Sequence, residues 1–117
     1  MNIDPIIDPN TISELKATVG FEFTGELIDT YLEETPRLIE ELVQQLEKLD
    51  TVAFGRTAHS IKSSSASLGA LRFAAQAKEL ELMGKAGDLT GAEVKVEQLK
   101  VNYGQVKRAL KELKDGS

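Results

Sequence analysis

The sequence contains no cysteine and only one histidine, His59, in 117 residues. Without cysteine there can be no disulfide, no thiolate nucleophile and no cysteine-based zinc site. One histidine among scattered carboxylates also falls short of a typical transition-metal ligand set. We therefore expect a chain that holds no metal ion.

The chain also lacks long apolar runs and basic patches. No apolar run approaches the roughly 18 residues of a membrane-spanning helix, and no charged-then-apolar leader opens the sequence. The net charge is −5, with acidic residues in every segment, whereas nucleic-acid binding requires a basic surface. These features predict a soluble, cytoplasmic protein that binds neither membranes nor nucleic acid.

Strand patterns are missing as well, since no segment alternates apolar and polar residues with a period of two. Helical spacing and cap signals instead predict helices joined by short loops. The first helix should begin with Asp8 as N-cap and Pro9 at its first position, and end at Gly20. Its expected buried residues are Ile12, Leu15 and Val19.

The second expected helix runs from Glu22 to about Leu49, with apolar residues on one side and glutamates on the other. Pro36 lies inside it, and proline removes a backbone hydrogen bond and crowds the preceding turn. We therefore expect a kink near Thr35, or two abutting helices.

The third and fourth expected helices follow directly. Asp50 can cap the third, which ends before Gly69, and its predicted buried stripe consists of Phe54, Ala58, Ile61, Ser65 and Leu68. The fourth runs from Ala70 to about Lys85, with Gly84 and Gly87 as its stop, and its predicted buried residues are Phe73, Ala77 and Leu80.

The last expected helix opens with a capping-box signature, Thr90 followed by Glu93. Its apolar stripe consists of Val96, Leu99, Tyr103, Val106, Leu110 and Leu113. The pattern predicts an all-α fold, an antiparallel helix bundle. We expect one domain over residues 1–117, with an ordered core of about 8–113 and frayed flanks.

His59 and Lys62 lie one turn apart on the third expected helix. With Phe54 at zero and about 100° per residue, the buried stripe spans about 40°, while Lys62 falls at about 80° and His59 at about 140°. His59 is therefore expected on an outward flank, next to the small residues Ser63 and Ala66. A neutral imidazole there has a free lone pair and can act as a nucleophile, and a lysine ammonium one turn away can reach an anionic group on the ring.

Simpler explanations exist for both features of this helix. A lone histidine is commonly a solvated or satisfied side chain. The serines of this helix can reflect an unselected surface composition, can donate hydrogen bonds to carbonyls of the preceding turn, or can let another protein approach closely. A hydrolytic site is disfavoured, because Ser60 and Ser63 lack a glycine-framed nucleophile turn.

The segment AHSIKSSSASLGA, from Ala58 to Ala70, resembles the signature of histidine-containing phosphotransfer (HPt) domains. That pattern is Ala-His-x-hydrophobic-Lys-Gly-small-small, followed by hydrophobic-Gly-hydrophobic. The resemblance continues through LRFA at residues 71–74 and into LELMGKAGDL, and it covers essentially the whole chain.

The resemblance implies an antiparallel four-helix bundle with a short extra N-terminal helix. It also implies a phosphorelay carrier in two-component signalling rather than an enzyme in its own right. His59 would carry the phosphoryl group on Nε2, and Lys62 would steady its oxygens. Glu81 would accept the Nδ1 hydrogen, although its place beside the apolar stripe leaves a solvated carboxylate as the alternative. The site holds no metal, and Mg²⁺ would come from the partner receiver.

The implied partners are a sensor histidine kinase and the receiver domain of a response regulator, whose aspartate exchanges the phosphoryl group with His59. The docking surface should surround His59 and include Arg56, Ser60 and Ala66. The chain departs from the family at Ser63, where glycine is usual. We expect transfer to survive, with the Ser63 hydroxyl either bonding the phosphoryl group or narrowing the partner's approach.

Alternatives remain in three other classes. The chain could be a phosphate-inert module that binds receivers, although an inert relative need keep neither His59 nor Lys62. It could be the phosphorylatable segment of a larger chemotaxis-type histidine kinase. A structural bundle that pairs through the last helix is weaker, because that stripe matches the second helix, so we expect a monomer.

Overall fold

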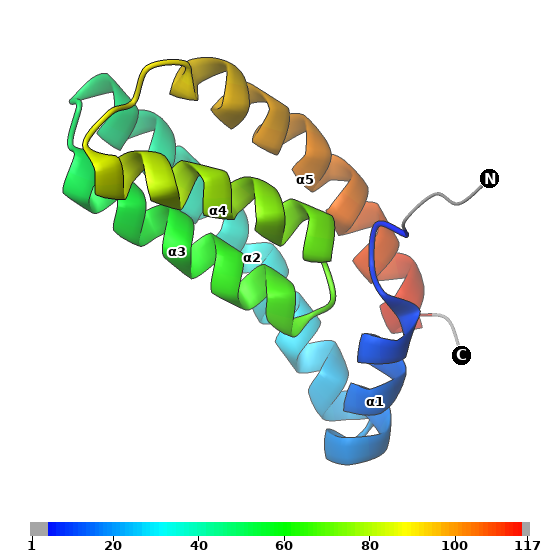
Figure 1. The fold of residues 1–117 in the computed structure, drawn as a ribbon. Coiled ribbons are helices and arrows are strands. Elements are labelled where there is room, and N and C mark those ends of the chain that lie inside the picture. Colours follow the sequence, from blue (N-terminus) through cyan, green and yellow to red (C-terminus); the bar gives the residue numbers. More distant parts are fainter. Residues whose placement is uncertain (1–4, 116–117) are drawn as a thin grey trace.

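The computed structural model describes residues 5–115, and all of its regular structure in that range is helical. The helices are α1 (Pro9–Val19), α2 (Phe21–Glu47), α3 (Thr51–Ser67), α4 (Leu71–Ala86) and α5 (Ala92–Asp115). Figure 1 shows α2 to α5 as a bundle, with α1 beside the first turns of α2. The predicted fold class, a four-helix bundle with a short N-terminal helix, is confirmed.

The four bundle helices form a closed ring in which each packs on its neighbours. α3 lies between α2 and α4, and α5 completes the ring by packing on α4 and α2. α3 and α5 are therefore at opposite corners of the bundle (Figure 1). The outer face of α3 is left uncovered by the other three helices, and this is the face that carries His59.

Two helices begin where their caps predict. The Asp8 carboxylate accepts from the backbone N–H of Asn10, with Pro9 at the first helical position, and the Asp50 carboxylate accepts from the N–H of Ala53. Both side chains satisfy backbone donors that the first turn of a helix leaves without partners. The predicted buried stripe of α3 is confirmed in full, from Phe54 to Leu68.

The N-terminal half departs from the expectations at three residues. Val19 is exposed rather than buried, because α1 ends there and turns at Gly20, whose φ is 93°. Leu49 is exposed and has a φ of 53°, since α2 ends at Glu47. α2 is continuous through Pro36, so the alternative of two abutting helices is wrong.

The bundle supplies a substitute for the backbone hydrogen bond that Pro36 removes. Proline has no N–H to donate to the carbonyl of Leu32, four residues earlier. The hydroxyl of Tyr103, on α5, donates to that carbonyl at 3.4 Å. Burial, reinforced by the neighbouring Tyr31, raises the pKa of Tyr103 to about 12, so the hydroxyl keeps its hydrogen.

The C-terminal half corrects two predicted boundaries. Gly84 lies inside α4 and is buried, and the helix ends at Ala86, with Gly87 as its C-cap at a φ of 71° that suits glycine. Thr90 is not the N-cap of α5, because that helix begins at Ala92. The chain is held here by the side chain of Asp88, which accepts from the N–H of Thr90.

Buried and helical residues are described on both sides of residues 8–113. Ile7 is buried, and α5 continues to Asp115, with Lys114 donating to Asp29 on α2 at 2.7 Å. The flanks expected to be frayed were residues 1–5 and 114–117, and this is wrong for Lys114 and Asp115, which lie in α5; residues 1–4 and 116–117 lie outside the described residues. Within residues 5–115, none of the helices combines the length and apolarity needed to cross a membrane.

Candidate functional site

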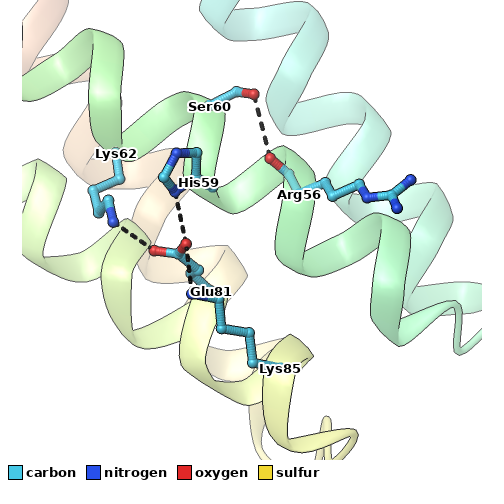
Figure 2. A network of polar contacts seen from close by, with 6 residues as sticks. All are labelled: Arg56, His59, Ser60, Lys62, Glu81 and Lys85. Atoms are coloured by element: carbon cyan, nitrogen blue, oxygen red, sulfur yellow. Dashed lines mark hydrogen bonds and ion pairs between the residues drawn. The ribbon is translucent and has the colours of Figure 1, made fainter.

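His59 lies in the middle of α3 on its uncovered face, and 58% of its side chain is exposed. Figure 2 shows the ring with Nδ1 turned toward α4. Among the described residues, Nε2 has no hydrogen-bond partner. The helix therefore presents one ring nitrogen to solvent and turns the other toward the protein.

Glu81 supplies the group that meets the inner nitrogen. Its side chain comes from α4 and is only 4% exposed, and its Oε2 lies 2.7 Å from Nδ1 of His59. Lys62, 28% exposed, donates to the other oxygen, Oε1, at 2.7 Å, and Lys85 lies 3.4 Å from Oε2. The Glu81 carboxylate thus contacts His59 and Lys62 on α3 and Lys85 on its own helix, α4.

These contacts set the ionisation of Glu81. The hydrogen bond from Lys62 is the largest influence, and with those from His59 and Lys85 it lowers the pKa of Glu81 from 4.5 to about 2, against the opposing effect of burial. Glu81 is therefore an ionised, acceptor-only group at neutral pH. A neutral imidazole must then carry its hydrogen on Nδ1 to make the bond, which leaves the lone pair on the exposed Nε2.

The sequence places Glu81 beside the apolar stripe of its helix, a position that also suits a solvated carboxylate. The structure shows it buried in the interface between α3 and α4. Lys85 was not among the candidates. Its spacing of four residues from Glu81 on one helix is a sequence signal that could have identified it.

A depression of about 620 Å³ lies beside His59, between α3 and the end of α4. Arg56 and Lys85 place positive charge around it, and the exposed Val52 adds an apolar side chain. Two of the three residues expected on the partner surface, Arg56 and Ser60, line this depression, whereas Ala66 is exposed further along α3 and does not. The complete lining consists of Thr51, Val52, Gly55, Arg56, His59, Ser60, Glu81, Gly84 and Lys85.

The serines of α3 divide into three groups. The hydroxyls of Ser60, Ser64 and Ser67 donate to carbonyls of the preceding turn, as one of the alternatives had it. Ser65 is buried, with its hydroxyl 2.7 Å from that of Tyr31. Ser63 is exposed, and within residues 5–115 its hydroxyl makes no hydrogen bond.

Over the described residues, no group of three or more histidine, aspartate or glutamate side chains is placed to hold one. The Glu81 carboxylate, which lies next to His59, already contacts His59, Lys62 and Lys85.

Comparison with known proteins gives two matches. The family model described as Hpt domain matches residues 26–116. Among solved structures, the chain is similar to histidine-containing phosphotransfer protein B (HptB) from Pseudomonas aeruginosa PAO1, with a TM-score of 0.90 and 27% sequence identity. That match covers 98% of this chain and 99% of the other. No curated protein matches the sequence.

Proposed function

Since the chain belongs to the Hpt domain family, whose members pass phosphate between histidine kinases and response regulators, we propose that His59 is its phosphorylated residue. The observation that carries this is the bond between Nδ1 of His59 and the buried, ionised Glu81. This bond leaves a lone pair on the exposed Nε2, and a nucleophile needs such an accessible lone pair to attack the phosphorus.

The transfer step is a displacement at phosphorus. The Nε2 lone pair attacks the phosphorus of a receiver's aspartyl phosphate, the P–N bond forms as the P–O bond breaks, and the aspartate leaves as a carboxylate. The Nδ1 hydrogen stays on the ring, where Glu81 faces the positive charge that the imidazole acquires. The same steps in reverse pass the phosphoryl group from His59 to an aspartate.

Lys62 supports the phosphoryl group in this proposal. It lies one turn from His59 and holds Glu81 in the unphosphorylated protein. Its ammonium can turn from Glu81 to the phosphoryl oxygens, while Lys85 remains near the carboxylate. Mg²⁺ would be supplied by acidic residues of the receiver, because oxygen ligands are what this ion prefers.

The depression beside His59 is the proposed docking surface. A receiver that holds Mg²⁺ in an acidic pocket is attracted by the positive charges of Arg56, Lys62 and Lys85 around the imidazole. The apolar Val52 and the small Ser60 leave room for side chains of the partner. Ser63 and Ala66 extend this surface along α3.

A phosphorylation assay with a histidine kinase and a receiver tests the proposal. Parent protein should acquire an acid-labile, alkali-stable label and pass it to the receiver, and a His59→Gln variant should acquire none. A Gln105→Ala variant, altered at an exposed position of α5, serves as the control and should behave as the parent does. A label retained by the His59→Gln protein would refute the assignment, and a parent that binds the receiver but never labels would favour the phosphate-inert module.

A further inference from the structure

α3 and α4 come into direct backbone contact next to the site. Gly55 lies four residues before His59 on α3, and Gly84 lies three residues after Glu81 on α4. A Cβ added to Gly84 would lie 2.6 Å from Cα of Gly55, 2.7 Å from its nitrogen and 2.8 Å from the carbonyl oxygen of Thr51. All three are backbone atoms, so no side-chain rotation can make room.

The glycine contact and the His59–Glu81 bond belong to one interface. Because α3 and α4 are consecutive and antiparallel, the residues before His59 face the residues after Glu81. The contact lies one helical turn from the bond between Nδ1 and Oε2. The separation of the two helices at the glycines therefore sets how far the Glu81 side chain must reach.

We propose that Gly84 is a positioning residue for His59, acting through Glu81. An ordinary contact begins at about 3.4 Å, so a Cβ at 2.6 Å requires the backbones to separate by about 0.8 Å. Glu81 moves with α4, whereas its partners His59 and Lys62 belong to α3. Bonds of 2.7 Å stretched by that amount exceed the roughly 2.7–3.2 Å usual for hydrogen bonds from nitrogen to oxygen and are weakened.

Of these two glycines, Gly84 is the one whose position has no room for a Cβ. A Cβ at Gly55 would lie 3.5 Å from Cα of Gly84 and 3.6 Å from the carbonyl oxygen of Glu81, which are ordinary contacts. At Gly104 of α5, a Cβ would meet nothing within 4 Å. The chain thus offers one disruptive alanine substitution, one tolerated substitution in the same interface, and one remote control.

The ring of His59 reports directly on the proposal. In the unphosphorylated parent the ¹⁵N spectrum of the imidazole should show the Nδ1–H tautomer, and Gly55→Ala and Gly104→Ala should preserve it. Gly84→Ala should shift the ring toward the Nε2–H tautomer, and Glu81→Ala should do the same. A folded Gly84→Ala protein with parental ring shifts would overturn the proposal, because a residue that serves stability alone leaves the tautomer unchanged.

Sucrose, which favours the folded state, is added if Gly84→Ala does not fold in buffer. A chain that fails to fold even then would assign Gly84 to stability and overturn the proposal. This measurement uses no kinase or receiver, so it distinguishes failure of the positioning role from failure of the phosphotransfer function on which its consequence rests.

Transfer kinetics supply the second measurement. A displacement of this size near reacting atoms costs about 10- to 100-fold in rate, so Gly84→Ala should slow phosphoryl transfer by that factor. In the Glu81→Ala background it should slow transfer no further, because residues that act through one contact are not additive. Losses that multiply in the double variant would show that Gly84 does not act through Glu81.

Discussion

Lys62 on α3 and Glu81 on α4 are joined by a hydrogen bond of 2.7 Å, with Nζ donating to Oε1. The second oxygen of the same carboxylate meets Nδ1 of His59. The group that orients the proposed nucleophile therefore also holds the cation expected to receive the phosphoryl oxygens.

Glu81 should make the stability of the protein depend on acid pH. Its pKa is lowered from 4.5 to about 2, so it stabilises the fold above about pH 4.5 and loses this contribution as the pH falls toward 2. Urea unfolding across this range should show a steeper decline for the parent than for Glu81→Gln. Glu79→Gln, which alters an exposed carboxylate of the same helix, should decline as the parent does; equal slopes for the parent and Glu81→Gln would contradict the proposed ionisation.

Removing the charge of Lys62 should weaken the phosphorylated state. Lys62→Gln leaves the phosphoryl oxygens without an ammonium, and a hydrogen bond to a charged group contributes about 1.5–3 kcal/mol. The phosphorylated fraction at equilibrium with a receiver should fall by about 10- to 100-fold. Lys100→Gln, which breaks an exposed lysine–glutamate pair on α5, is the matched control. An unchanged equilibrium in Lys62→Gln would mean that this lysine serves Glu81 alone.

Ser63 should contribute a hydrogen bond to the phosphoryl group. Its hydroxyl is exposed, lies one turn from His59 and has no partner within residues 5–115. Ser63→Ala and Ser63→Gly should both shorten the lifetime of phosphohistidine, by a few-fold, since a neutral hydrogen bond contributes about 1 kcal/mol. Ser67→Ala removes a hydroxyl already bonded to the helix and should leave the lifetime unchanged. A parental lifetime in both Ser63 variants would remove any role for the hydroxyl.

Tyr103 and Pro36 should be energetically coupled. The Tyr103 hydroxyl donates to the Leu32 carbonyl that Pro36 leaves without its usual partner. Tyr103→Phe should therefore lower the free energy of unfolding by about 1 kcal/mol. In a Pro36→Ala background, where the backbone N–H is restored, the same substitution should cost less. Denaturant unfolding of the four proteins in this cycle measures the coupling, and equal costs in both backgrounds would show that the hydroxyl does not replace the lost bond.

Local signals predicted much of this fold because they depend on local physics. Asp8 and Asp50 cap their helices through side chains that reach only two or three residues. The four-and-three spacing of α3 places His59 outward whatever lies on the other side of the bundle. The same spacing places Lys62 one turn from His59, whereas Glu81, 19 residues from Lys62, was identified from the family pattern.

The errors arose where tertiary contacts override local preference. Gly84 reads as a helix stop, but close packing against Gly55 keeps glycine there inside α4. Pro36 reads as a break, but Tyr103, 71 residues further along the chain, supplies a donor. Helical periodicity alone leaves Glu81 as a surface carboxylate, because nothing within α4 shows that Lys62 and His59 will meet it from α3, and its assignment came from the family resemblance instead.

The diagonal placement of α3 and α5 gives the protein a convenient handle for spectroscopy. Since the chain contains no cysteine, a single engineered thiol is a unique attachment point for a fluorophore. Val101, 70% exposed on α5, lies on the helix at the far corner of the bundle from His59. A dye there can report the binding and dissociation of a receiver in real time without covering the face of α3 around His59, where the receiver is proposed to dock.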